Sequence, residues 1–177
     1  MARWSYSGGK MIYIYTDGAS RGNGGESAAA WIIVDKNCKE IMRGVRHIGL
    51  ATNNMAEYMA VHDAVQYCYL NCVFDSKEDG GCKIISDSQL VVNQLKGVWK
   101  INNKNLKEIN HNIKFYIDHM DTKFEYEWAS RTHPIIKDCD RMNNNILDTV
   151  KDLVISGHPD LVKLVNGDPL NESMKRT

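Results

Sequence analysis

Three β-strand patterns in succession, ahead of any helical pattern, constrain the fold of this chain more than any other feature. The strand-like segments 11–16, 28–34 and 40–48 are separated by turn-rich sequences, which predicts an antiparallel meander. From residue 55 onward, helical patterns alternate with strands, which is typical of parallel additions to a sheet. These later elements are predicted as helices at 55–70, 88–96, 106–119 and 136–154 and as strands at 83–86 and 124–129. We therefore expect an α/β fold, a five-stranded mixed sheet flanked by helices in the order βββαβααβα.

The chain is predicted to form one domain with a short segment at each end. Its 177 residues correspond to about one domain. The periodic patterns occupy residues 11–155, so we interpret 1–10 as an N-terminal leader and 156–177 as a C-terminal tail. Nothing in the sequence requires more than a monomer.

Charge and apolar content exclude several classes of protein. Lys+Arg and Asp+Glu both number 22, so a nucleic-acid partner would have to be held by a local basic patch. The longest apolar run, 28–34, has seven residues, which is too short for a membrane span, and residues 1–10 lack the apolar core of a signal peptide. The five cysteines contain no Cys-x-x-Cys pair, so we expect reduced thiols in a cytoplasmic protein without a membrane partner.

Four acids stand where a sheet of this order could bring them together. They are Asp17 at the end of the first strand, Glu57 in the first turn of the long helix, Asp87 after the fourth strand and Asp140 on the last helix. The carboxyl ends of neighbouring strands form the usual site of an α/β sheet. Each acid also has a structural interpretation: a turn pair, a capping box that starts at Asn54, a helix start or a solvated flank of an apolar stripe. As a group, however, four acids with few cationic neighbours would repel one another, and Mg²⁺ would relieve that repulsion.

Segments around these acids resemble the signature segments of type 1 ribonuclease H. They read Tyr15-Thr16-Asp17-Gly18-Ala19-Ser20 with Gly22-Asn23, Thr52-Asn53-Asn54-x-x-Glu57-Tyr58, and Ser86-Asp87-Ser88-Gln89. Cys139-Asp140-Arg141-Met142 resembles the acid near the start of the last helix in that family. The resemblance covers about residues 11–152 and includes the order and spacing of the elements.

This resemblance implies an endoribonuclease that hydrolyses the RNA strand of an RNA/DNA hybrid and leaves 5′-phosphate and 3′-hydroxyl ends. The residues that it makes catalytic and metal-binding are Asp17, Glu57, Asp87 and Asp140. They would hold two Mg²⁺ ions, with Mn²⁺ as an alternative ion and Asp17 as the bridge between the two. One ion would activate the attacking water and the other would stabilise the leaving 3′ oxygen, as in the general two-metal scheme.

The resemblance also implies residues that contact the hybrid. Asn54 and Gln89 match positions that read the 2′-hydroxyl in the minor groove, and an amide can both donate and accept there. Asn53 belongs to the same segment, and Thr52 would lie near a DNA phosphate. The structural alternatives are helix capping for Asn53 or Asn54 and an ordinary surface position for Gln89.

A glycine-rich loop is predicted to follow the first strand, which we expect to stop at Asp17-Gly18. The loop 18–25 begins with Gly18 and includes Ser20. Its glycines would let the backbone approach the RNA closely.

Two segments depart from the fuller pattern of the family. Many members carry a basic, tryptophan-rich protrusion after the second helix, whereas this chain has only the short stretch 96–104 with Trp99 and Lys100. This stretch is either the local basic patch that grips the hybrid or a solvated turn between helices. Before the last helix, His133 is the candidate for a loop histidine that assists proton transfer or product release in several members; the alternative is an exposed histidine without a catalytic role.

Two other functions stay open on the sequence alone. A catalytically silent domain of this fold, which would bind hybrid or a protein partner, is expected to lack at least one of Asp17, Glu57 and Asp87, and all three are present. A related metal nuclease such as an exonuclease acting on DNA would have no 2′-hydroxyl to read, so Asn54 and Gln89 argue against it.

Overall fold

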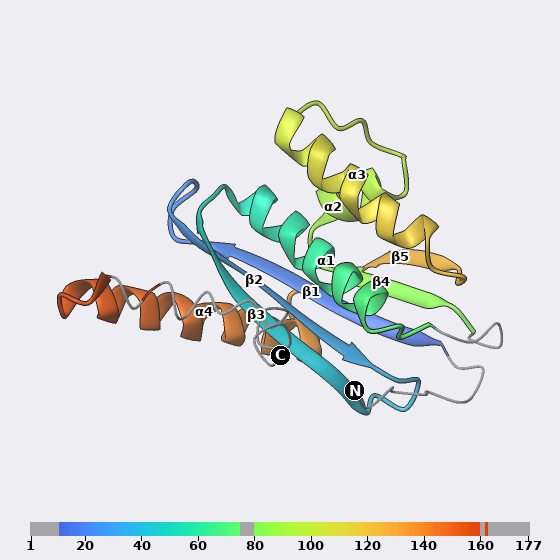
Figure 1. The fold of residues 1–177 in the computed structure, drawn as a ribbon, viewed down its shortest axis with the longest axis horizontal. Coiled ribbons are helices and arrows are strands. Elements are labelled where there is room, and N and C mark those ends of the chain that lie inside the picture. The colour runs from blue at the N-terminus through green and yellow to red at the C-terminus, as the bar shows by residue number, and fades with distance from the viewer. Residues whose placement is uncertain (1–10, 75–79, 160–161, 163–177) are drawn as a thin grey trace, which may run out of the picture.

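One mixed sheet of five strands lies at the centre of the protein, with helices on both of its faces (Figure 1). The computed structural model describes residues 11–74, 80–159 and 162, so the predicted leader 1–10 and most of the predicted tail 156–177 lie outside the described residues. The strands are β1 (Ile12–Ser20), β2 (Glu26–Val34), β3 (Glu40–Leu50), β4 (Cys82–Ser86) and β5 (Phe124–Trp128). The helices are α1 (Asn53–Leu70), α2 (Gln89–Leu95), α3 (Lys104–Asp118) and α4 (Pro134–Ile155).

The strands are arranged in the order β3-β2-β1-β4-β5, and the elements follow one another along the chain as βββαβααβα. The expected α/β fold is therefore confirmed. β1, β2 and β3 form the antiparallel meander, and β4 and β5 are added in parallel on the other side of β1. Antiparallel neighbours need only a tight turn, whereas each parallel addition needs a helical crossover. β1 thus lies between an antiparallel and a parallel neighbour at the middle of the sheet.

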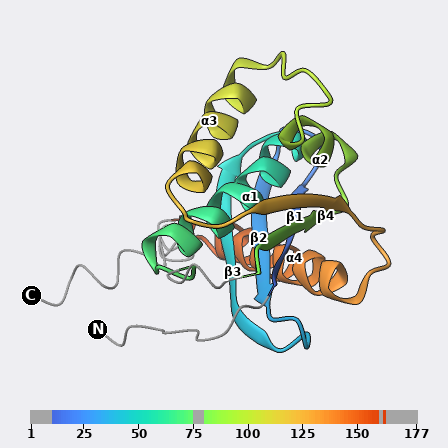
Figure 2. The same cartoon turned by 90° about the vertical axis from the view of Figure 1, so that its right-hand side faces the viewer.

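Both faces of the sheet are covered, which explains why the central strands are apolar on both sides. Along β1, Ile12 and Ile14 pack into the core under α1, while Tyr15 packs with Ile136 and Cys139 of α4. Helices α1 and α3 lie together on one face, and α4 runs across the opposite face (Figure 2). Within the described part of the chain, no helix has the length and apolar character to span a membrane.

β1 is longer than predicted, because it continues through Gly18. The strand pairs with β2 as far as Ser20, opposite Ser27, so the expected loop 18–25 is reduced to residues 21–25. Gly18 remains in the strand because α1 passes so close that a Cβ there would lie 2.1 Å from the backbone nitrogen of Glu57. The Asp-Gly pair therefore marks a close strand–helix contact and not a turn.

The starts of the four described helices also differ from the prediction: α1, α3 and α4 begin two residues earlier and α2 one residue later. α1 begins at Asn53 because the Thr52 hydroxyl accepts a hydrogen bond from the backbone N–H of Met55, at 3.3 Å. The cap is thus neither Asn53 nor Asn54, and the capping box that would have made Glu57 structural is wrong. α4 begins two residues earlier than expected, at Pro134, a residue whose fixed φ suits the first turn of a helix.

Candidate active site

Three of the predicted acids converge where β1 and β4 run side by side. Thr16 pairs with Ser86 in the parallel register, so the next residues along each strand, Asp17 and Asp87, lie beside each other. Glu57 reaches the same point from the second turn of α1. One carboxylate oxygen from each of the three lies within 4.8 Å of the others. Among the described residues, these acids are the only group of three or more potential ligands that meets this distance.

Gly18 positions the acid that comes from the helix. Its missing side chain lets α1 approach the strand, and its backbone N–H donates to Glu57 Oε2 at 3.2 Å. This contact orients the carboxylate toward the strand end. Gly18, predicted to help the backbone approach RNA, therefore has a structural role in assembling the acids.

Burial and mutual repulsion make the acid cluster unfavourable when it is ionised. Asp17 is 6% exposed and Glu57 is 2% exposed. Burial, followed by the charge of Asp87, raises the pKa of Asp17 from 3.8 to about 7. Burial, followed by the charges of Asp17 and Asp87, raises the pKa of Glu57 well above its ordinary 4.5. Asp87 Oδ1 is buried and has no hydrogen-bond partner among the described residues. The ionised cluster therefore needs positive charge to offset its repulsion, and Asp87 Oδ1 needs a hydrogen-bond donor or a cation.

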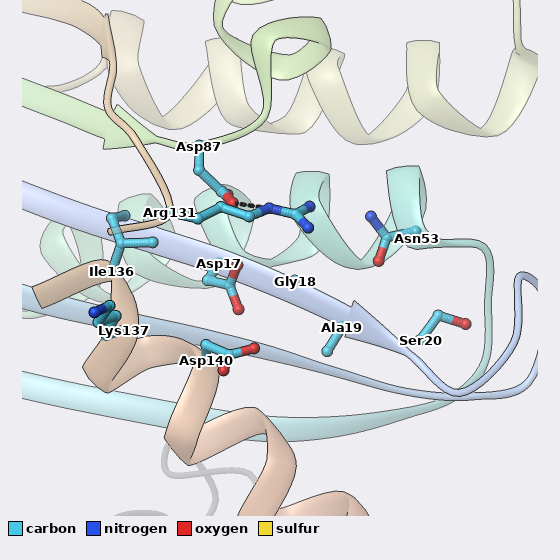
Figure 3. Close-up of a pocket in the computed structure, with 10 residues that line it drawn as sticks. All are labelled: Asp17, Gly18, Ala19, Ser20, Asn53, Asp87, Arg131, Ile136, Lys137 and Asp140. Atoms are coloured by element: carbon cyan, nitrogen blue, oxygen red, sulfur yellow. Dashed lines mark hydrogen bonds and ion pairs between the residues drawn. The ribbon is translucent and has the colours of Figure 1, made fainter. Parts of the chain in front are cut away.

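Arg131 is a cation in direct contact with this cluster, and our sequence analysis missed it. It lies in the loop between β5 and α4, and its Nε donates to Asp87 Oδ2 at 2.7 Å (Figure 3). The Arg131 side chain is 80% exposed, whereas that of Asp87 is 2% exposed. An exposed guanidinium is screened by water and held by one contact, so it compensates the buried charge only in part. The sequence contains one indication of this role: Arg131 is the sole Lys or Arg between β5 and α4.

Asp17 and Asp87, but not Glu57, line a pocket of about 440 Å³ whose wall also contains Asp140. In Figure 3, Asp87 and Asp140 lie on opposite sides of Asp17. Asp140 is exposed and does not belong to the tight group of three, although its charge contributes to the raised pKa of Asp17. The pocket is lined by Asp17, Gly18, Ala19, Ser20, Asn53, Asp87, Arg131, Ile136, Lys137 and Asp140.

A second residue that the sequence analysis missed, Asn143, contacts Asp17 from α4. Its Nδ2 donates to Asp17 Oδ2 at 2.8 Å and to the Asp17 backbone oxygen at 3.0 Å. Asn143 is completely buried. The signal in the sequence was a polar residue within the apolar stripe of the last helix, one turn after Cys139.

His133 does not line the pocket. Its Nδ1 accepts a hydrogen bond from the backbone N–H of Ile135 at 3.3 Å, which makes it the N-cap of α4. Its ring stacks on Tyr15, with centroids 4.8 Å apart. The structure therefore gives His133 a local structural role, and the prediction of a catalytic loop histidine receives no support from this geometry.

Three of the residues predicted to contact the hybrid are exposed at the protein surface. Asn54 near the start of α1 and Gln89 at the start of α2 are both exposed. Thr52 is also exposed, although its hydroxyl is used to cap α1. None of these positions conflicts with contact to a nucleic acid.

Ser20 and Asn53 line the pocket directly. The Ser20 hydroxyl donates to the backbone oxygen of Ala51 at 2.8 Å, which fixes the end of β1 to the segment before α1. Trp99 and Lys100 lie on the connection between α2 and α3, where Trp99 is 46% exposed. The backbone oxygen of Lys100 accepts from Gln94 Nε2 at 3.1 Å, so this short connection is anchored to α2.

Comparison with known proteins places the fold and these segments in one family. The family model described as RNase H matches residues 9–145. A curated relative, Ribonuclease HI of Halobacterium salinarum, is 40% identical over 99 residues, which are 56% of this chain and 47% of that protein. The chain thus spans less than half of the length of this curated relative.

Solved structures agree with this assignment. The crystal structure of RNase H1 from Halobacterium salinarum superimposes with a TM-score of 0.69 at 31% identity, covering 78% of this chain and 98% of the other. LC11-RNase H1, isolated from compost by a metagenomic approach and crystallised in complex with an RNA/DNA hybrid, gives a TM-score of 0.71 at 29% identity, with coverage of 78% and 98%. The family match extends over most of the chain and includes Asp17, Glu57, Asp87 and Asp140. The chain belongs to the RNase H family.

Proposed function

We propose that this protein is a metal-dependent endoribonuclease that hydrolyses the RNA strand of RNA/DNA hybrids and leaves 5′-phosphate and 3′-hydroxyl ends. One observation carries the proposal: the family-matched acids Asp17, Glu57 and Asp87 place their oxygens within 4.8 Å of one another beside an open pocket. The hybrid-bound LC11-RNase H1 and the other ribonucleases named above support the substrate class.

The acid cluster fits a hard divalent cation. Its donors are all carboxylate oxygens, which Mg²⁺ prefers. Asp87 Oδ1 is buried without a partner among the described residues, and the pKa values of Asp17 and Glu57 are raised first by burial and then by repulsion among the acids, which a cation would relieve. Asp17, Glu57 and Asp87 would hold the first ion, and Asp140 on the other side of Asp17 would supply the fourth acid for a second. When bound, two such ions supply an activated water and charge stabilisation for the leaving oxygen.

The surrounding residues would position the acids and the substrate. Gly18 holds Glu57, and Arg131 puts a positive charge at the mouth of the pocket, where it would attract a backbone phosphate. Asn54 and Gln89 present exposed amides at helix starts, where they would read 2′-hydroxyls. Trp99 and Lys100 would contact the nucleic acid further from the cleavage point.

The direct test is cleavage of three labelled substrates by the full chain: an RNA/DNA hybrid, duplex RNA and duplex DNA, each with Mg²⁺, with Mn²⁺ or with EDTA. Asp17→Asn removes one ligand charge, and Asp152→Asn, an exposed acid on α4, is the matched control. We expect metal-dependent cutting of the hybrid's RNA strand alone, retained in Asp152→Asn and lost in Asp17→Asn. Product ends that accept a 5′ label only after phosphatase treatment would identify the 5′-phosphate.

The outcome separates the two functions still open. Hybrid binding without cleavage under both metals would exclude the enzyme and favour the catalytically silent domain. Cleavage of duplex DNA at a comparable rate would contradict the substrate assignment, because Asn54 and Gln89 would then have no group to discriminate.

A further inference from the structure

A completely buried amide interrupts the apolar face of α4. The buried residues on this face are Ile136, Cys139, Asn143, Ile146, Leu147 and Val150. An amide in such a position loses its water and is retained only where it makes specific hydrogen bonds. Among the described residues, the Asn143 side chain makes its hydrogen bonds to Asp17 alone.

The contact is a clamp in which one nitrogen holds two atoms of the same acid. Asn143 Nδ2 donates to the backbone oxygen of Asp17 at 3.0 Å and to its Oδ2 at 2.8 Å, so both amide hydrogens are used. The reverse orientation of the amide would set Asn143 Oδ1 against two oxygen acceptors, so the contacts themselves determine which atom is the nitrogen. Because the main chain and the carboxylate are held together, the Asp17 side chain is fixed relative to its own backbone.

An amide at this position costs free energy, because one of its polar atoms is buried without a hydrogen bond to any described residue. Good packing alone therefore does not explain why an asparagine stands there. Asn143 Oδ1 is buried and has no hydrogen-bond partner among the described residues. A leucine of similar shape would fill the same apolar stripe without leaving an oxygen unsatisfied. Within the described part of the chain, the amide oxygen of Asn143 is left unpaired while its nitrogen is hydrogen-bonded. The presence of this amide is therefore explained by the hydrogen bonds that it donates to Asp17.

The three acids differ in how they are held. Glu57 accepts from the backbone of Gly18, and Asp87 accepts from the exposed side chain of Arg131. Asp17 is the acid held by a buried side chain. A carboxylate has about four lone-pair sites, so the bond to Oδ2 leaves the remaining sites of Asp17 available to a cation.

We propose that Asn143 is a positioning residue, which holds the Asp17 carboxylate in the orientation that binds the metal and thereby determines the metal affinity of the site. This inference rests on the proposed metal-dependent function. Partners that orient a metal ligand from outside the coordination sphere typically change metal affinity or activity by about ten- to a hundredfold when they are removed. Asn143 touches the ligand and not the reacting atoms.

The test compares Asn143→Leu and Asn143→Ala with Asn145→Ala, an exposed asparagine on the same helix. Four quantities are measured for each variant and for wild type: the unfolding midpoint without metal, the dissociation constant for Mn²⁺ by calorimetry on the free protein, and kcat and KM for the hybrid at saturating Mg²⁺. We expect Asn143→Leu to unfold at or above the wild-type midpoint and to bind Mn²⁺ about ten- to a hundredfold more weakly. The KM for the hybrid should stay unchanged, and Asn145→Ala should match wild type.

Each other outcome overturns the inference. Wild-type Mn²⁺ affinity in a folded Asn143→Leu or Asn143→Ala would show that the clamp has no part in metal binding. A loss of folding in both variants without metal would make Asn143 a purely structural residue. If wild type itself neither binds Mn²⁺ nor cleaves the hybrid, the proposed function fails with it, whereas an active wild type beside unaffected variants refutes the role of Asn143 alone.

Discussion

The stability of the metal-free protein should fall as the pH rises, because the acid cluster is buried without enough positive charge. The pKa of Asp17 is 3.8 in an exposed state and about 7 in the folded protein. Between these two values the folded state holds a proton that the unfolded state has lost. Stability therefore decreases with rising pH across this window, which is the opposite of the usual effect of a salt-bridged acid.

The size of the effect follows from the same two values. Each pKa unit corresponds to about 1.4 kcal/mol, so a rise from 3.8 to about 7 amounts to ~4 kcal/mol. Folded domains are stable by about 5 to 15 kcal/mol, so this is a large share of the total. Asp17→Asn keeps the shape of the side chain and an oxygen for Asn143, but it cannot ionise. We expect the variant to be more stable than wild type by up to ~4 kcal/mol at about pH 8, and nearly equal to it at about pH 4.

The assay is urea unfolding followed by circular dichroism in EDTA at several pH values, with Asp152→Asn as the exposed control. Addition of Mn²⁺ at about pH 8 should then narrow the difference between the two proteins, since a ligand at a hundredfold excess over its dissociation constant contributes about 2.7 kcal/mol to the protein that binds it. Wild type gains this stabilisation and Asp17→Asn loses most of it. Two results would refute this reasoning. One is a metal-free wild type whose stability does not change between about pH 4 and pH 8, and the other is an Asp17→Asn variant that is no more stable than wild type at about pH 8.

Three further changes test the parts that surround the acids. Gly18→Ala places a Cβ 2.1 Å from backbone on α1, so we expect a loss of about 1 to 3 kcal/mol in urea unfolding together with lost activity; an unchanged midpoint would contradict the close contact. Arg131→Ala removes the 2.7 Å contact to Asp87, which should lower metal-free stability by up to about 1 kcal/mol and tighten Mn²⁺ binding in calorimetry, because a competing cation is gone. Weaker Mn²⁺ binding would instead show that Arg131 supports the ion. Gln89→Ala removes a hydrogen bond worth about 1 kcal/mol, so it should raise the KM for hybrid several-fold and leave Mn²⁺ binding and stability unchanged. A KM equal to that of wild type would show that Gln89 does not contact the hybrid.

The element order and the meeting of the acids could be predicted because both depend on local patterns. Strand and helix periods follow directly from the apolar residues, and parallel neighbours bring their carboxyl ends together. In the structure, Asp17 and Asp87 each follow a residue of the same cross-strand pair, Thr16 and Ser86, which puts them at neighbouring carboxyl ends as expected.

The end of β1 was predicted too early, because the local sequence alone does not determine where this strand ends. An Asp-Gly pair commonly forms a turn, and further glycines follow Gly18, so the local pattern favoured a loop. The strand continues because α1 crosses it at a distance that only glycine allows. That requirement comes from a helix that starts more than thirty residues later in the chain, and no nearby residue encodes it.

The residues that orient the acids were harder to predict than the acids themselves, and the reason is geometric. Periodicity assigns a residue to a face of α4, but it does not reveal which atom of β1 lies opposite that face. Asn143 could be recognised from sequence only as a polar residue on a buried stripe, and Arg131 only as a cation in a loop. Their partners, Asp17 and Asp87, are set by the docking of α4 on the sheet and by the path of the chain from β5. The same docking directs His133 onto Tyr15 and away from the pocket. A carboxylate can therefore be proposed from its motif, whereas the hydrogen bonds that orient it depend on how distant elements pack.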